Sequence, residues 1–356
     1  MGPGEEEVTA AEAGTGRRRA MGMSAARAER LLGAMAGKKV LVVGDLMLDR
    51  FVYGEVTRIS PEAPVPVVRV RRETSMPGGA SNVACNLRAL GAGAAVAGMV
   101  GKDPAGMELR WLLEESGVDA ECALPFAGAR TTVKERVIAE RQQVVRVDFE
   151  QEAGWPARQR EKFAAVLGVK LEEADGVIVE DYGKGAVTPA VVEQVMAAAR
   201  RRGIPVGLDP KEGHELGIRG ITVATPNRKE AFAIAETADP GAKEDPLTDK
   251  ALLRVAAALE EKWEAEHVAI TLGPQGMLLW GKGKAKHVPT RAREVFDVSG
   301  AGDTVIAALT AGLAAGGSFT AAAELANYAA GVVVGKLGTA SCSPQELVAH
   351  IRGGKG

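Results

Sequence analysis

The stretch of the chain best suited to chemistry is residues 297–304, with the sequence DVSGAGDT. It follows a predicted strand end and opens an Ala-rich run of helical composition. If a helix starts here, the backbone amides of Gly300, Ala301 and Gly302 point outward without partners, and the helix dipole adds partial positive charge. Such a helix start is an anion hole, and Asp303 at its mouth could take a proton from an attacking hydroxyl. The alternative is an Asp or Ser N-cap on an ordinary Gly-rich turn.

Two further aspartates follow a predicted buried strand. Residues 39–44 form a short, β-branched run, which is typical of a strand inside a parallel sheet. Ligand sites in open α/β sheets lie beyond the carboxyl ends of the strands, so Asp45 and Asp49 fall where a polar substrate would be held. The alternative is a turn aspartate followed by a solvated one.

A second Gly-rich stretch leads into a predicted helix over residues 83–90. The paired glycines Gly78 and Gly79 allow a ligand to approach the backbone closely, because no Cβ stands in the way. Asn82 comes just after them and could form a hydrogen bond with a hydroxyl group. This stretch is therefore a second candidate binding segment.

From residue 155 onward, helical and strand patterns alternate regularly. This alternation predicts an α/β fold, in which a mostly parallel sheet carries helices on both faces. Polar residues follow the predicted strand ends in series, and we expect them to lie along one edge of the sheet and to form a site. The segments concerned begin at Asp181, Asp209, Thr225 and Thr271, and the first of them contains Lys184.

Four β segments do not fit this alternation: 51–54, 65–70, 131–139 and 142–149. We expect them to form one small sheet, inserted at about residues 50–72 and 129–150, that projects from the main domain as a lid or a dimer clasp. Lys134 and Arg136 lie two positions apart on one of these strands, so both side chains face the same side.

Composition limits the classes of function. The chain has 356 residues, of which 46% are hydrophobic and 25% charged, and a net charge of −2. There is no basic surplus that would favour nucleic acid or an anionic membrane surface. Three widely spaced cysteines indicate reduced thiols and a cytoplasmic protein. We expect a disordered leader and a short helix over residues 1–35, a frayed tail at 353–356, and no segment that spans a membrane.

The two Gly-rich stretches resemble the two signatures of the ribokinase-like (phosphofructokinase-B) sugar kinases. The patterns are Gly78-Gly79-x-x-Asn82 and Asp297-x-x-Gly300-Ala301-Gly302-Asp303, in the family's order and spacing, with Asn227-x-x-Glu230 between them. The resemblance covers roughly residues 36–352. It implies a ribokinase-like three-layer α/β/α domain with a small β-sheet lid, and a homodimer through that lid sheet.

Within this family, residues 43–50, 58–67, 181–185 and 331–339 are similar to the bacterial heptose-7-phosphate kinases. This resemblance implies ATP-dependent phosphorylation of the C1 hydroxyl of D-glycero-D-manno-heptose 7-phosphate to the 1,7-bisphosphate, a step of ADP-heptose and lipopolysaccharide core synthesis. Such kinases are often fused to a nucleotidyltransferase domain, an activity we expect to be absent here. A kinase for another sugar or sugar phosphate and a non-catalytic sugar- or nucleotide-sensing relative are the alternatives.

The resemblance also implies a role for each matching residue. Asp303 becomes the general base, the amides from Gly300 to Gly302 hold the transferring phosphoryl group, and Glu230 holds Mg²⁺ through water. Lys134, Arg136 and Lys184 are the open candidates for the partner of the sugar phosphate group. Plain helix capping by Asn227 and plain helix packing by Asn327 are alternatives. Nucleotide binding is implied for Asn227, Arg228, Lys229, Glu230, Thr271, Gly273, Gly276 and Asn327, and substrate binding for Asp45, Asp49, Gly78, Gly79, Asn82, Lys134, Arg136, Asp181, Lys184 and Asp209.

Overall fold

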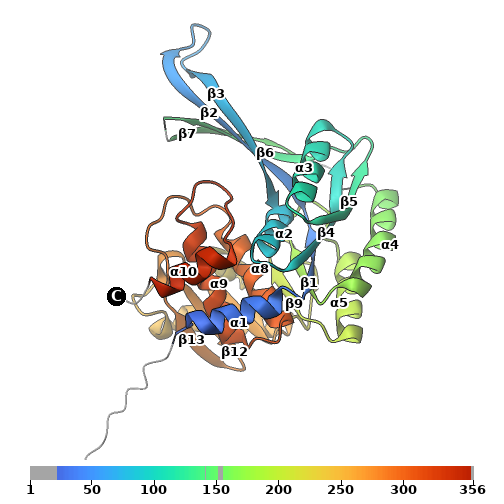
Figure 1. The fold of residues 1–356 in the computed structure, drawn as a ribbon, viewed down its shortest axis with the longest axis vertical. Coiled ribbons are helices and arrows are strands. Elements are labelled where there is room, and N and C mark those ends of the chain that lie inside the picture. Colours follow the sequence, from blue (N-terminus) through green and yellow to red (C-terminus); the bar gives the residue numbers. More distant parts are fainter. Residues whose placement is uncertain (1–21, 141, 151–154, 354–356) are drawn as a thin grey trace, which may run out of the picture.

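A nine-stranded sheet forms the centre of the computed structural model, which describes residues 22–140, 142–150 and 155–353 (Figure 1). Its strands are β1 (Lys39–Gly44), β4 (Gly93–Gly101), β5 (Asp119–Phe126), β8 (Gly176–Glu180), β9 (Val206–Asp209), β10 (Val223–Ala224), β11 (His267–Thr271), β12 (Met277–Gly281) and β13 (Lys284–Val288). The spatial order is β13-β12-β11-β10-β9-β8-β1-β4-β5. Neighbours from β5 to β11 pair in parallel, and only the β12–β13 hairpin adds antiparallel strands at one edge.

Helices cover both faces of this sheet, so the predicted α/β class with a mostly parallel sheet is confirmed. One face packs against α1 (Ala25–Met35), α2 (Ala80–Ala89), α3 (Pro104–Glu115), α8 (Ala301–Ala314), α9 (Phe319–Val333) and α10 (Pro344–Arg352). The other face packs against α4 (Ala157–Glu173), α5 (Pro189–Arg202), α6 (Arg228–Ile234) and α7 (Lys250–Trp263). The edge strand β5 was not predicted, because its sequence DAECALPF mixes polar residues and a proline with its apolar positions.

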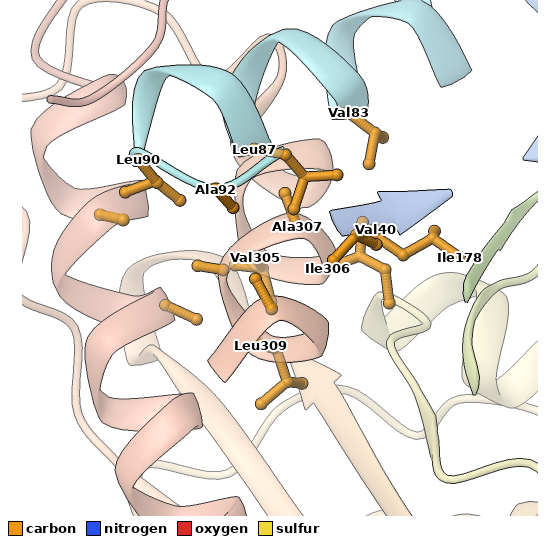
Figure 2. Packing of buried hydrophobic residues seen from close by; sticks show 14 of the residues in the cluster. Val40, Val83, Leu87, Leu90, Ala92, Ile178, Val305, Ile306, Ala307 and Leu309 are labelled. Carbon is orange, nitrogen blue, oxygen red and sulfur yellow. The ribbon is translucent and has the colours of Figure 1, made fainter. Parts of the chain in front are cut away.

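Helix α8 is held firmly against the sheet. Its first three turns are almost entirely buried, and Ile306 lies beside Val40 of β1 and Ile178 of β8 (Figure 2). Small residues allow close helix packing: a Cβ on Gly312 of α8 would come within 2.9 Å of the Cβ of Ala322 on α9. Because α8 is fixed in this way, its amino end is held at the carboxyl edge of the parallel strands.

A separate four-stranded sheet projects from the main domain, which confirms the predicted lid sheet (Figure 1). Its order is β3 (Pro66–Gly79), β2 (Leu46–Ile59), β6 (Thr132–Ala139) and β7 (Gln142–Phe149). Strands β2 and β3 are longer than predicted, since the ladder continues to the pair Leu46 and Gly79. Asp49, Gly78 and Gly79 therefore lie on the lid strands and not in loops that follow the main sheet.

The ends of the chain are partly outside the described residues. The predicted disordered leader before Gly22 and the tail after Gly353 lie there, whereas the expected short helix is α1, capped by the Ser24 side chain. Among the helices that the structure describes, none is long and apolar enough to cross a membrane.

Candidate active site

The Asp303 carboxylate lies in the first turn of α8 and is nearly buried, with 8% of the residue exposed. Its Oδ2 accepts a hydrogen bond from Asn82 Nδ2 at 2.5 Å, and its Oδ1 accepts one from the Tyr182 hydroxyl at 3.3 Å. Burial raises the pKa of Asp303, while these two hydrogen bonds oppose that rise because they favour the charged form. The structure thus joins Asp303 and Asn82, two residues that the sequence analysis placed in separate motifs.

A chain of side chains orients Asn82. The Asn86 side-chain Nδ2 donates to the backbone carbonyl oxygen of Asn82 at 3.0 Å and to Asn82 Oδ1 at 3.3 Å. Asn86 Oδ1 in turn accepts a hydrogen bond from the Thr304 hydroxyl at 2.8 Å. Because Asn82 Oδ1 is occupied as an acceptor, its Nδ2 is directed toward Asp303, and α2 and α8 together position the Asp303 carboxylate.

The amino end of α8 offers unpaired backbone donors. Gly300 is the N-cap with φ of +76°, and no side chain caps the helix. The Ala301 amide donates to the Val298 carbonyl at 3.3 Å, so its predicted place in the anion hole needs correction. Within the described residues, the amides of Gly300, Gly302 and Asp303 have no acceptor. The open donors therefore lie directly beside the Asp303 carboxylate.

A cavity of about 300 Å³ lies on one side of these amides. Its lining is largely apolar, with Met277, Val298 and Val305 among the contributors. An apolar slot that ends at open amides suits a flat base joined to phosphates. Asn327 borders it but also donates to the Pro289 carbonyl at 2.7 Å, so helix packing is part of its role. Six of the predicted residues line this one cavity: Thr271, Gly273, Gly276, Ala301, Gly302 and Asn327.

The Asn227-x-x-Glu230 pair forms a capping box at the start of α6. Asn227 Oδ1 accepts from the Glu230 amide at 3.0 Å, and Glu230 Oε2 accepts from the Asn227 amide at 2.9 Å. The capping that was the alternative for Asn227 is thus present. The capping box uses Glu230 Oε2 and leaves Oε1 for another partner. Burial raises the pKa of Glu230. An isolated bridge places Asn227 beside Thr271 at the cavity.

The two residues between them do not line the cavity, and their nucleotide-binding roles stay predictions. The Arg228 guanidinium is bound by Asp239 at 2.7 and 2.8 Å, by Asp249 at 2.9 Å and by the Gly241 carbonyl, so its donors are occupied. The Lys229 side chain is 84% exposed and lies 3.4 Å from Glu212.

The lid contributes charged groups on the other side of Asp303. Asp49 Oδ1 accepts from Arg136 Nη1 at 2.6 Å. Lys134 Nζ lies 5.1 Å from the centre of the Tyr182 ring, and burial lowers its pKa. Gly78 gives Asp49 its room, since a Cβ there would come within 2.5 Å of Asp49 Oδ2. The predicted residues Asp49, Gly78, Asn82, Lys134 and Arg136 are therefore brought together near Asp303.

Three predicted substrate ligands are occupied by protein partners, so these predictions need correction. The Asp45 carboxylate accepts the backbone amides of Tyr182, Lys184 and Ala186 at 2.9–3.0 Å, which leaves it little capacity for sugar hydroxyls. Asp181 is bound to His214 Nδ1 at 2.7 Å and to the Gly183 amide at 2.9 Å. Lys184 Nζ lies 2.5 Å from Glu150 at the end of β7. Gly79, with φ of +54°, approaches the Asp45 carbonyl too closely for any Cβ.

Buried carboxylates meet beneath Asp303. Carboxylate oxygens of Glu180, Asp209 and Asp303 all lie within 4.8 Å of one another, at the ends of β8 and β9 and the start of α8. One oxygen of Glu180 is buried without a hydrogen-bond partner among the described residues. Burial raises the pKa of Glu180 and of Asp209. The Asp209 charge raises the pKa of Glu180 further, whereas the charges of Glu230 and Asp303 raise that of Asp209. A donor set of carboxylate oxygens with an orphaned lone pair fits a hard divalent cation.

The sequence analysis missed Glu180, Tyr182 and Asn86. Asn86 follows Asn82 by four positions, a spacing that places both on one face of a helix, so this signal was readable. Glu180 is the last residue of an otherwise apolar strand, GVIVE, where a buried carboxylate is rare unless it has a function. Tyr182 gave no local signal, because its contact with Asp303 joins positions 121 residues apart.

Replacing the two glycines at the amino end of α8, Gly300 and Gly302, should separate their roles. Gly300→Ala places a Cβ 2.8 Å from Asn82 Nδ2 and forces an L residue into positive φ. We expect it to lower the free energy of unfolding by roughly 1–3 kcal/mol. A Cβ on Gly302 meets nothing within 4 Å, so Gly302→Ala is the matched control and should be stable. Thermal and urea unfolding measure both; equal stability of the two variants would contradict this account of Gly300.

Comparison with known proteins extends the picture. The model of the pfkB family of carbohydrate kinases matches residues 37–346. Among curated proteins, the chain is 46% identical over 316 residues to "Bifunctional protein HldE" of Citrifermentans bemidjiense, covering 88% of this chain and 63% of the relative. It is 47% identical over 321 residues to the protein of the same name from Caulobacter vibrioides, covering 89% and 64%. The chain thus spans just under two thirds of the length of these relatives.

Solved structures show the same fold at low sequence identity. Arabidopsis thaliana ribokinase complexed with ribose and ATP superposes with a TM-score of 0.67 at 18% identity, covering 88% of this chain and 99% of that one. Phosphofructokinase-2 from Escherichia coli gives a TM-score of 0.68 at 21% identity, with the same coverage. These structures show the fold, and the family match over residues 37–346 shows that the chain belongs to the pfkB family of carbohydrate kinases.

Proposed function

We propose that this protein uses ATP to phosphorylate the anomeric hydroxyl of a heptose 7-phosphate, giving the 1,7-bisphosphate in ADP-heptose synthesis. The observation that carries the proposal is the buried Asp303 carboxylate beside open amides, between an apolar cavity and the charged lid. The choice of sugar rests on the sequence similarity to heptose-7-phosphate kinases and on the relatives named HldE.

The chain's own groups divide the work. Asp303 removes the proton from the acceptor hydroxyl, and Asn82 and Tyr182 keep the carboxylate ionised and correctly directed. The amides of Gly302 and Asp303 stabilise negative charge on the transferring phosphoryl group. The apolar cavity holds the nucleotide base, and Asp49 accepts sugar hydroxyl groups. Phosphoryl transfer requires mainly positioning and charge stabilisation, which is what this arrangement supplies.

Magnesium fits the carboxylates beneath the transfer point. Glu180 and Asp209 would hold the ion, and Glu230 would hold it through water. Burial raises the pKa of Glu230, and the Glu230 charge raises the pKa of Asp209, so a cation would stabilise both carboxylates. When bound, Mg²⁺ neutralises phosphate charge and orients the phosphates. The sequence had pointed to Glu230 for the metal and to Asp209 as a substrate ligand or a support of the metal, so Glu180 is the addition to the proposed metal set.

A sugar panel tests the function. With ATP and Mg²⁺, turnover should be fastest on heptose 7-phosphate and much slower on fructose 6-phosphate or ribose, and chelation of the metal should stop it. Asp303→Asn should keep nucleotide affinity and lower kcat by about 100- to 10,000-fold, because the base is lost. A coupled ADP assay and a nucleotide titration measure these quantities.

Other outcomes of the same panel identify the alternatives. A faster rate with another sugar or sugar phosphate would make this a kinase of different specificity. Tight binding of heptose 7-phosphate without turnover would indicate a sensing protein. Retained turnover in Asp303→Asn would overturn the general-base assignment.

The pH dependence should report the Asp303 environment. The base is active when ionised, and burial raises its pKa, so kcat/KM should fall on the acid side above the usual range of an aspartate. Tyr182→Phe removes a donor that favours the carboxylate, so the pKa rises further and the acid limb moves to higher pH. Tyr328→Phe, on α9 beside His350, is the control and should leave the limb unchanged. An unmoved limb in Tyr182→Phe would show that the hydroxyl does not act on Asp303.

We also propose a cytoplasmic homodimer formed through the lid. The lid strands expose Ile59, Val70 and Val145 by 60%, 48% and 47%, an apolar surface that a second lid could cover. Sedimentation should give twice the chain mass, and Val145→Glu should shift the protein toward a monomer. A monomeric wild-type protein would contradict the dimer without affecting the chemistry.

A further inference from the structure

The inner face of the lid carries a cluster of charges that the transfer step does not use. We define this face by Asp49 on β2, Lys134 and Arg136 on β6, and Arg146 and Asp148 on β7. Alternate residues of a strand share a face, and the Arg136–Asp49 hydrogen bond joins β6 to β2 on this one. The face is directed at the active site, because Lys134 lies over the Tyr182 ring and Tyr182 contacts Asp303.

Two arginines stand opposite each other on this face. Arg136 and Arg146 are direct partners in the β6–β7 register. Like charges directly opposite destabilise an antiparallel pair, so the arrangement is unfavourable unless an anion compensates it. Each guanidinium donates to its own carboxylate: Arg136 to Asp49 at 2.6 Å, and Arg146 to Asp148 at 2.8 and 2.9 Å. Among the described residues, no carboxylate bonds to both arginines.

Along the lid, Arg136 and Arg146 lie where the end of the sugar opposite the acceptor hydroxyl would be. Lys134 and Asp148 are opposite each other nearer the root of the lid, and Lys134 lies over the ring of Tyr182, which contacts Asp303. Arg136 and Arg146 lie two residues further out on their strands, which is about 7 Å. A sugar whose acceptor hydroxyl meets Asp303 and whose ring meets Asp49 would extend its last carbon toward the two arginines.

We propose that Arg136 and Arg146 together bind the phosphate group that the sugar acceptor already carries. This inference rests on the proposed function and names the group that selects a phosphorylated acceptor. Two guanidinium forks match a phosphate dianion better than ammonium groups do. Of the other two candidates, Lys134 lies at the transfer end, over the Tyr182 ring, and Lys184 lies outside the lid, in the segment after β8.

The pairing also couples phosphate recognition to sugar recognition. In the structure Arg136 occupies Oδ1 of Asp49. A phosphate that draws Arg136 away leaves this oxygen free to accept a sugar hydroxyl. A sugar without the phosphate must compete with Arg136 for Asp49, so it binds less well.

Arg146→Gln tests the proposal without altering Asp49 or Arg136. We expect kcat/KM for the sugar phosphate to fall roughly 10- to 100-fold, the usual effect of losing hydrogen bonds to a charged group. The inhibition constant of the same sugar without its phosphate and the KM for ATP should stay within about twofold. Arg146→Lys should fall between, since it keeps the charge and loses the fork.

Arg71→Gln is the matched control. Arg71 is also a lid arginine paired with a carboxylate, Glu55 at 2.7 Å, and is 51% exposed against 49% for Arg146. Its substitution should leave every constant unchanged. If wild type prefers the phosphorylated sugar and Arg146→Gln loses nothing, or loses the free sugar equally, the inference is wrong and the proposed function stands. If wild type binds both sugars equally, the phosphorylated acceptor itself is wrong.

Discussion

The hydrogen bond between Asn82 and Asp303 is the interaction on which the rest of the site depends. A carboxylate buried at the end of a helix would tend to take up a proton, because desolvation disfavours its charge. Asn82, the Tyr182 hydroxyl and the amino end of α8 each oppose that tendency. These three groups come from distant parts of the chain, so an ionised base at this position requires that α2, α8 and the segment after β8 be assembled correctly.

Asp45 shows how that assembly is achieved. Its carboxylate accepts the amides of three alternate residues, Tyr182, Lys184 and Ala186, and so fixes the segment that carries the tyrosine hydroxyl. Lys184 in the same segment reaches Glu150, at the point where the lid returns to the main domain. Asp45 and Lys184, which the sequence analysis assigned to substrate binding, thus fix the segment whose Tyr182 hydroxyl contacts Asp303.

Signals carried by the backbone were predictable from the sequence. Gly78-Gly79 and Gly300 could be recognised because close approach or positive φ demands glycine locally. The alternation of strands and helices likewise gave the parallel sheet. The occupied state of Arg228 and Asp181 was not predictable, because their partners Asp249 and His214 are 21 and 33 residues away. Glu180 lies beside Asp209 because of the β8–β9 register, which cannot be read from the sequence.

The two halves of the site differ in how they are built, and this difference bears on specificity. The apolar cavity is formed within the main domain by α8, α9, the β11–β12 turn and the segment between β13 and α8. The acceptor side is shared between that core and a projecting sheet whose charges are satisfied by exchangeable partners. An apolar slot suits the nucleotide that the proposed function requires, while a charged surface on a separate sheet can be altered without disturbing Asp303. In the proposed function, the lid is therefore the part of the molecule that selects the acceptor, and α8 is the part that supports transfer.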